Sequence, residues 1–346
     1  MRTIEKIWHS KPIASMPLWP FALIFWSLSI VRKNLLRASV KAETKVPVII
    51  IGNISVGGTG KTPILLELAH YVISQGLKVG IVSRGYGGKK ASYPVSVSAD
   101  SEVAEVGDEA LMLAKSINVP IVVDPDRRRG LRALVASNTI DVVLSDDGLQ
   151  HYQLERALEI VVVDGARLFG NKLLLPAGPL RESVGRLNTV DFVLTNGSKD
   201  ELEIVKCEAK RFKYFNTNSF FSASVTPLFF ENLLSGDRRA FAGAPFKIGS
   251  ELQVVSGIGN PQRFYSLLEG LPYGLKIFEF PDHHQFSLQG LEKAGVDFFQ
   301  PIVMTDKDAV KCVNFADKNF WSLVIKLELD PNFLSAFMKS LFKVIQ

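Results

Sequence analysis

The feature that most constrains the fold is a glycine-rich loop between an apolar run and a helical pattern. Residues 46–51 are almost wholly aliphatic, residues 53–62 read Asn-Ile-Ser-Val-Gly-Gly-Thr-Gly-Lys-Thr, and a helical pattern begins at Pro63. A loop between a buried strand and a helix can aim several backbone N–H groups at one phosphate, and the helix N-terminus adds positive potential. The sequence therefore predicts a phosphate-binding loop in an α/β domain.

Each residue type in the loop suits this chemistry. The glycines allow the backbone to approach a phosphate closely, Lys61 can reach the β- and γ-phosphate oxygens, and the Thr62 hydroxyl can bind Mg²⁺. A departure from the usual pattern is Ser55, which stands where a first glycine is common. An isolated Gly-Lys-Thr turn is the alternative, but the strand and helix on either side disfavour it. The candidate ATP-binding residues are Ser55, Gly57, Gly58, Thr59, Gly60, Lys61 and Thr62.

The rest of the chain alternates short β-branched runs with helical stretches. Continuous apolar runs are typical of strands buried on both faces of a parallel sheet, so we expect a doubly wound α/β fold of the P-loop NTPase type. The expected strands are Val46–Ile51, Val79–Ser83, Pro120–Val123, Val142–Ser145, Ile160–Val163 and Phe192–Thr195, and then Leu252–Gly257, Leu275–Phe280 and Pro301–Thr305. The expected helices include Pro63–Gln75, Asp108–Ser116 and a last helix at Pro331–Val344.

The rhythm breaks between about 200 and 245, where turn residues separate short β-like pieces. We expect an N-terminal helix in residues 1–41, a nucleotide-binding domain in 42–220, and a smaller α/β domain with the C-terminal helix in 221–346.

The strand at 142–145 ends in Asp146 and Asp147. In phosphate-loop proteins an acidic residue at the end of a neighbouring strand holds the metal. A solvated pair of aspartates at a turn is the simpler interpretation, but together with the loop the pattern favours a Mg²⁺ site.

Residues 12–31 form twenty uncharged residues, and Pro20 suits the first turn of a helix that would run from Phe21 to about Lys41. Residues 1–45 carry eight Lys or Arg and two Glu, a balance of +6 against +5 for the whole chain. An apolar and aromatic half followed by a basic half is typical of a helix lying at a membrane surface. A buried core helix and a single membrane span are the alternatives, and no cleavage site of a secretory signal follows.

Other classes of protein are disfavoured. Two cysteines and five histidines show no disulfide framework and no zinc spacing. Nothing outside the N-terminal segment resembles a basic or aromatic nucleic-acid surface, and no obligate protein partner is indicated.

Several motifs resemble the tetraacyldisaccharide 4′-kinase family over nearly the full chain. They are Gly52-Asn-Ile-Ser-Val-Gly-Gly-Thr-Gly-Lys-Thr-Pro63, Val82-Ser-Arg-Gly-Tyr-Gly-Gly88, Val106-Gly-Asp-Glu109, Asp126-Arg127, Asp146-Asp-Gly-Leu-Gln-His151, Pro176-Ala-Gly-Pro-Leu-Arg-Glu182, Gly257-Ile-Gly-Asn-Pro-Gln-Arg-Phe264, Phe280-Pro-Asp-His-His284 and Met304-Thr-Asp-Lys-Asp-Ala-Val-Lys311. The resemblance implies transfer of the γ-phosphoryl group of ATP to the 4′-hydroxyl of a membrane-embedded tetraacyldisaccharide 1-phosphate, which yields lipid IVA. It also implies a nucleotide domain followed by a smaller α/β domain joined by a β linker, and a peripheral or monotopic location at the cytoplasmic face of the inner membrane.

The resemblance also suggests residue roles. Asp108 is the candidate base for the sugar hydroxyl, although a helix cap is its simpler interpretation. His283 or His284 would orient Asp108, unless the two are a packing pair in a loop. Gln150 and Glu182 are further candidates near the metal. The candidate substrate-binding residues are Arg84, Arg127, Arg128, Arg181 and His151.

Two rival functions remain open at this stage. A regulatory P-loop NTPase at the membrane would hydrolyse nucleotide without an acceptor. A soluble P-loop carboxylase or ligase, such as a biotin-precursor enzyme, would have no need of the apolar segment at 12–31.

Overall fold

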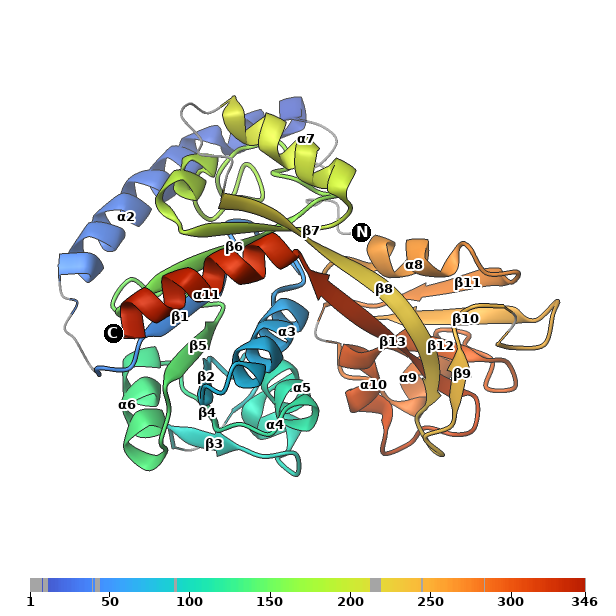
Figure 1. The fold of residues 1–346 in the computed structure, drawn as a ribbon. Helices are drawn as coiled ribbons and strands as arrows, with labels where there is room; N and C mark the ends of the chain where they lie inside the picture. Colours follow the sequence, from blue (N-terminus) through green and yellow to red (C-terminus); the bar gives the residue numbers. More distant parts are fainter. Residues whose placement is uncertain are drawn as a thin grey trace.

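The computed structural model describes residues 8, 12–38, 40, 44–89, 92–211, 219–243, 245–282 and 284–345. Its strands join one mostly parallel sheet in the order β11-β10-β12-β13-β8-β7-β6-β1-β5-β2-β4-β3, with β9 paired to β8 (Figure 1). The strands of the first half are β1 (Val48–Gly52), β2 (Val79–Ser83), β3 (Val95–Val97), β4 (Ile121–Val123), β5 (Val142–Asp146), β6 (Leu158–Asp164) and β7 (Phe192–Asn196). This is the predicted doubly wound α/β architecture, with β3 as an additional antiparallel edge strand.

Strand β1 lies at the centre of the first half, between β5 and β6 and parallel to both. All five of its residues are buried because helices cover both faces of the sheet. Ile49 and Ile51 join one apolar cluster, while Val48 and Ile50 join the cluster on the opposite face. The continuous aliphatic run is thus the consequence of a strand with no solvent face.

The helices divide between these two faces. Helices α3 and α5 supply side chains to the cluster around Ile49, and α6, α7 and the 3₁₀ helix η2 supply side chains to the cluster around Ile50. The bounds are α3 (Lys61–Ser74), α4 (Val103–Val106), α5 (Asp108–Ser116), α6 (Arg127–Ser137), η2 (Val184–Thr189) and α7 (Lys199–Lys210).

Two long strands connect the halves. β8 (Phe220–Asn232) pairs in parallel with β7 at its start and antiparallel with β13 (Phe320–Leu329) along most of its length. β13 in turn pairs in parallel with β12, so the same sheet continues into the second half (Figure 1). The predicted β linker is therefore one thirteen-residue strand rather than several short pieces.

The second half repeats the α/β pattern on a smaller scale, with β11, β10, β12 and β13 parallel to one another. Its elements are β9 (Arg238–Ala240), β10 (Glu251–Ser256), α8 (Pro261–Leu268), β11 (Gly274–Glu279), α9 (Leu288–Lys293), β12 (Ile302–Thr305) and α10 (Asp306–Cys312). The domain limits at 41 and 220 stay a prediction.

Helix α11 (Pro331–Ile345) returns to the first half (Figure 1). Phe333 and Phe337 are completely buried in the same cluster as Ile49 and Leu68, and the Phe333 ring packs edge-on against Phe192 with centroids 5.4 Å apart. Although α11 lies within residues 221–346, its apolar face completes the core of the first half.

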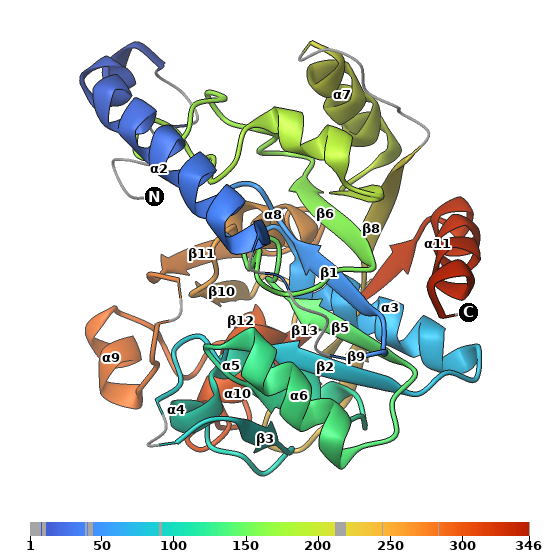
Figure 2. The same cartoon turned by 90° about the vertical axis from the view of Figure 1, so that its left-hand side faces the viewer.

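The N-terminal helices lie outside both cores. The 3₁₀ helix η1 (Pro12–Leu18) leads into α2 (Trp19–Ala38), which has Pro20 in its first turn as predicted. The predicted end, Lys41, lies outside the described residues. No residue of α2 is buried, and Phe21 and Leu23 are 59% and 64% exposed. The helix lies along the outside of the first half (Figure 2). By length and composition, Ser15–Ala38 could cross a membrane. The alternative of a buried core helix is wrong for α2.

We predict that Phe333→Ala lowers the free energy of unfolding by about 3–5 kcal/mol, because the ring leaves a cavity in a closed core. Phe342 on the same helix is 46% exposed and provides the matched control, for which Phe342→Ala should cost less than about 1 kcal/mol. Urea unfolding of the full-length protein measures both. Equal losses for the two variants would contradict the packing of α11 described here.

Candidate functional site

The glycine-rich loop connects β1 to α3, as the sequence predicts. Gly60 caps α3 with φ +81°, and a Cβ atom there would lie 2.1 Å from Nδ2 of Asn196. The same Asn196 nitrogen donates to the carbonyl of Thr59 at 3.0 Å. Only glycine fits this left-handed and crowded position, so Asn196 and Gly60 together fix the loop where it enters the helix.

Several buried polar atoms at and beside the loop have no hydrogen-bond partner among the described residues, and two of them matter here. They are Oγ1 of Thr59 and Oδ1 of Asp146. Buried oxygens are normally hydrogen-bonded, and the first N–H groups of α3 also lack intrahelical partners. Unpaired donors and acceptors therefore lie on both sides of Lys61. Bound phosphate groups would accept hydrogen bonds from the donors, and a metal ion would bind to the acceptors.

Asp147 and Lys61 form an ion pair with Nζ 3.5 Å from Oδ1. Asp147 adopts φ +46°, and its other carboxylate oxygen lies 3.4 Å from Nη1 of Arg181. Burial of Asp147 opposes its ionisation, but Lys61 and Arg181 outweigh burial and lower its pKa below the ordinary value. Asp147 is therefore a charged acceptor held beside Lys61.

Asp146 has the opposite environment. It is 2% exposed, and Ser83 donates its hydroxyl to Oδ2 at 3.3 Å. Burial, followed by the negative charges of Glu109 and Asp147, raises the pKa of Asp146 to about 7. A metal ion or another positive charge beside Asp146 would lower this pKa again, so Asp146 is a suitable ligand for a cation.

Among the described residues, no group of three or more His, Cys, Asp and Glu side chains could hold a metal ion. Mg²⁺ accepts few protein ligands when it also binds phosphate oxygens and water. Thr62, Asp146 and Asp147 fit such a partial site.

Two cavities meet at this loop. The first, of about 1350 Å³, lies between the loop, β5 and α2, and the second, of about 850 Å³, lies between α3 and the second half. Phe25, Trp26 and Leu28 of α2 line the first cavity. The residues that line both cavities are Gly58, Lys61, Glu109, Ile258, Gly259 and Lys307. Lys61 is thus reachable from two sides.

The second half closes over the loop through the Gly257-Ile-Gly-Asn segment. A Cβ atom on Gly259 would lie 2.5 Å from the backbone nitrogen of Gly58, so the close approach requires glycine. Lys307 places Nζ 3.4 Å from Glu109 and 3.5 Å from Asp282. Burial disfavours the Lys307 charge, but these carboxylates outweigh it and raise its pKa.

Asp108 is the first residue of α5 and follows Gly107, the capping residue. Its carboxylate is 4% exposed and lies 3.4 Å from Nζ of Lys311, which comes from the second half. Glu109, not Asp108, lines the cavities in this structure.

Of the two predicted histidines, the structure describes His284. His283 lies outside the described residues. His284 stacks on Phe280 with ring centroids 4.7 Å apart and meets the edge of Phe286. Burial first, and then the charge of Lys311, lowers the pKa of His284.

Four of the predicted substrate-binding residues line the first cavity: Arg84, Arg127, Arg181 and His151. Arg127 is also a structural brace, since Nη2 donates to the Asp146 carbonyl at 2.9 Å and burial lowers its pKa to about 10. Burial and the charges of Arg127 and Arg84 lower the pKa of His151 to about 4. Arg128 does not line this cavity, and its backbone N–H donates to Asp126 at the start of α6.

Gln150 and Glu182 line the first cavity and are hydrogen-bonded to each other, with Gln150 Nε2 donating at 3.0 Å. Glu182 also accepts from Tyr152 and from Lys33 of α2. Their predicted place near the metal stays a prediction. The quoted motifs contain Glu109 and Asp282 but assign them no role, and Lys33 and Tyr152 lie outside every motif. No motif spacing joins Lys33 to Glu182, because the two are far apart in the chain.

The chain resembles known proteins along almost its whole length. The profile of the family LpxK, tetraacyldisaccharide-1-P 4′-kinase, matches residues 14–343. A tetraacyldisaccharide 4′-kinase from Haemophilus influenzae is 41% identical over 93% of this chain and 91% of its own length. The Pasteurella multocida enzyme of that name is 37% identical over 96% and 97%.

The fold agrees with these matches. A crystal structure of LpxK from Aquifex aeolicus in complex with ATP superposes with a TM-score of 0.74, at 26% identity, covering 96% of this chain and 100% of that one. With the loop, the paired aspartates and the two cavities in place, this chain belongs to the tetraacyldisaccharide-1-P 4′-kinase family.

Proposed function

We propose that the chain transfers the γ-phosphoryl group of ATP to the 4′-hydroxyl of a tetraacyldisaccharide 1-phosphate, forming lipid IVA in lipid A biosynthesis. The observation that carries this proposal is the meeting of two cavities at Lys61. A phosphotransferase must bring donor and acceptor to one point from different sides, whereas a regulatory NTPase needs only one such site.

The second cavity suits the nucleotide. Thr59, Gly60 and Thr62 line it together with Lys61, and it extends between the two halves. The backbone N–H groups at the start of α3 would hold phosphate oxygens, and Thr62 with Asp146 or Asp147 would hold Mg²⁺. Bound Mg²⁺ would neutralise the charge that develops on the phosphates. The loop residues and Lys61 position the γ-phosphoryl group at the junction of the cavities.

The first cavity suits the acceptor. Arg84, Arg181 and His151 lie in it, and guanidinium groups bind phosphate oxygens through paired hydrogen bonds. Phe25 and Trp26 of α2 give the same cavity an apolar wall. A ligand with a phosphorylated sugar head and acyl chains matches this division.

Asp108 is the residue that we propose as acceptor of the 4′-hydroxyl proton. Asp108 is buried and lines neither cavity, so in this proposal its pair with Lys311 opens when the acceptor binds. Glu109, which already lines both cavities, is the nearest rival for the role.

We further propose that α2 lies in the cytoplasmic leaflet of the inner membrane. Its exposed apolar residues are continuous with the wall of the first cavity, which supports delivery of a lipid directly from the bilayer. The same reasoning supports treating residues 1–41, 42–220 and 221–346 as functional units, with α11 packed on the second of them.

We expect Lys61→Ala to lower phosphoryl transfer from ATP to a tetraacyldisaccharide 1-phosphate in mixed micelles by about 100-fold or more, because it removes an electrostatic donor.

Asp108→Asn should lower kcat to a similar extent, whereas Glu109→Gln should lower it less. The assay with and without acceptor also separates the two functions. ATP turnover that does not depend on the acceptor would favour the regulatory NTPase.

The environment of Asp146 predicts opposite effects on stability and activity. Its pKa is raised to about 7, so its charge opposes folding increasingly as pH rises from its ordinary value of 3.8. Asp146→Asn should therefore stabilise the nucleotide-free protein at pH 8 by roughly 1–3 kcal/mol while it abolishes Mg²⁺-dependent transfer. The stability difference should shrink toward zero as pH falls to about 4.

Asp147→Asn provides the matched control on the adjacent residue. The pKa of Asp147 is lowered by Lys61 and Arg181, so removing its charge should destabilise the protein at pH 8. Urea unfolding at several pH values measures both variants. A loss of stability for both at pH 8 would refute the proposed environment of Asp146.

Leu23→Asp should weaken co-sedimentation with anionic phospholipid vesicles about tenfold or more, because a charge replaces an apolar side chain in the acyl boundary. Ile248 in the second half is 74% exposed, and Ile248→Asp provides the control for an added surface charge. Unchanged binding of the Leu23 variant would exclude α2 as the membrane-contacting helix.

A further inference from the structure

Lys33 is the point at which α2 contacts the polar interior of the first half. Its ammonium lies 3.5 Å from Oε2 of Glu182 and 5.0 Å from the ring centroid of Tyr152. The two charged side chains are 26% and 12% exposed. Burial lowers the pKa of Lys33 and Glu182 works against this effect, so the ion pair is partly withdrawn from water.

Glu182 carries this contact to the phosphate-binding loop. Its other oxygen accepts from Nε2 of Gln150 at 3.0 Å, and the same nitrogen donates to the carbonyl of Asn53 at 3.0 Å. Asn53 is the first residue after β1 and also donates its side-chain amide to the Gly57 carbonyl at 3.3 Å. Three side chains therefore connect α2 to the start of the loop.

A second branch ends at the proposed catalytic lysine. Oε1 of Gln150 accepts from Nη1 of Arg181 at 3.3 Å, and Arg181 pairs with Asp147. Asp147 in turn pairs with Lys61. Gln150 thus stands where the two branches divide, with its amide orientation determined by Glu182 on one side and Arg181 on the other.

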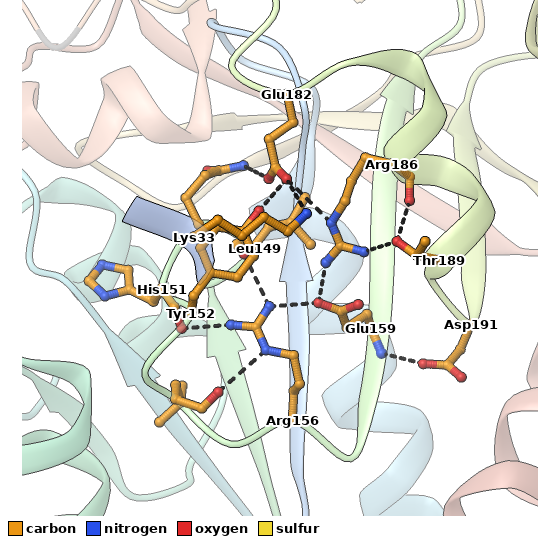
Figure 3. A network of polar contacts seen from close by, with 12 residues as sticks. Lys33, Leu149, His151, Tyr152, Arg156, Glu159, Glu182, Arg186, Thr189 and Asp191 are labelled. Atoms are coloured by element: carbon orange, nitrogen blue, oxygen red, sulfur yellow. Dashed lines mark hydrogen bonds and ion pairs between the residues drawn. The ribbon is translucent and has the colours of Figure 1, made fainter. Parts of the chain in front are cut away.

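Further hydrogen bonds and ion pairs hold Glu182 at Oε2, the carboxylate oxygen that does not contact Gln150. Tyr152 donates to Glu182, and Arg186 holds Glu182 and Glu159 from the side (Figure 3). Arg156 donates to Glu159 and also to the backbone carbonyls of Leu149 and His151. Lys33 is the network member that belongs to a helix without buried residues.

We propose that Lys33 is a positioning residue for phosphoryl transfer. Through Glu182 and Gln150 it sets the placement of the loop at Asn53 and of the Arg181–Asp147–Lys61 branch, so that α2 is part of the catalytic framework as well as a membrane contact. The inference rests on the kinase function proposed above but not on the seating of α2 in a bilayer.

Two other roles for Lys33 make different predictions. If Lys33 bound a phosphate of the acceptor, its loss would raise KM for the acceptor with kcat little changed. If Lys33 acted only at the membrane, its loss would matter only for acceptor presented in vesicles. A positioning role lowers kcat for both lipid and water-soluble acceptors.

The test compares Lys33→Met, Lys33→Arg and Arg37→Met in the full-length enzyme, with Mg²⁺–ATP and either the tetraacylated acceptor in mixed micelles or a deacylated disaccharide 1-phosphate. Arg37 provides the matched control, because it lies one turn along α2 and over the same Tyr152 ring at 5.2 Å. We expect Lys33→Met to lower kcat about tenfold with both acceptors, with both KM values within about twofold, and Lys33→Arg to recover most of the loss. Arg37→Met should keep a kcat several-fold above that of Lys33→Met.

A double-mutant cycle completes the test. In a Glu182→Gln background, Lys33→Met should have no further effect on kcat, because the carboxylate that it acts through is gone. The proposal would be overturned if the effects of Lys33→Met and Glu182→Gln on kcat were additive, or if Lys33→Met left kcat unchanged. It would also be overturned if the loss were confined to KM for the acceptor or to the acceptor in micelles. Thermal unfolding of every variant excludes misfolding as the cause, and absence of transfer by the wild-type enzyme would instead reject the proposed function.

Discussion

The placement of two adjacent carboxylates beside one lysine is the constraint on which the site depends. Asp146 ends a fully buried strand, and Asp147 turns out of it with a positive φ toward Lys61. The two carboxylates are adjacent in the chain but differ in environment. Lys61 and Arg181 outweigh burial at Asp147, whereas burial and the charges of Glu109 and Asp147 outweigh Lys61 and Arg127 at Asp146. Asp147 is therefore charged and paired in the absence of a ligand, whereas a further cation nearby would favour the charged form of Asp146. The loop, β5 and Arg127 together maintain this asymmetry.

Much of this arrangement could be predicted from the sequence because its elements are local. The apolar run before the loop, the glycines and Lys61 lie within fifteen residues, and the parallel strands follow from continuous burial on both faces. The placement of Asp146 and Asp147 at the same sheet edge follows from the rule that parallel strands present their carboxyl ends together.

What the sequence could not reveal depends on contacts between distant segments. β13 is separated from its partner β8 by almost a hundred residues, so its length and its pairing are decided by the ribbon it completes. Glu182 was expected near the metal, but its partners Lys33 and Tyr152 come from elements that no spacing rule connects to it. Asp108 was expected to face the reacting groups, and its pairing with Lys311 depends on how the two halves close. His284 has an aromatic packing environment that its neighbours Phe280 and Phe286 only create once the loop is folded.

The return of α11 has a consequence for how the chain is assembled. The second half leaves the first through β8 and comes back through β13, two strands that are paired with each other, and the last helix then seals the core around β1. The second half is therefore an insertion within the first rather than a unit appended to it. During synthesis the apolar face of the nucleotide-binding half stays uncovered until α11 has been made, although the loop of that half is made within the first seventy residues. A chain that ends before Pro331 would thus leave the catalytic half, and not the distal one, with an exposed core.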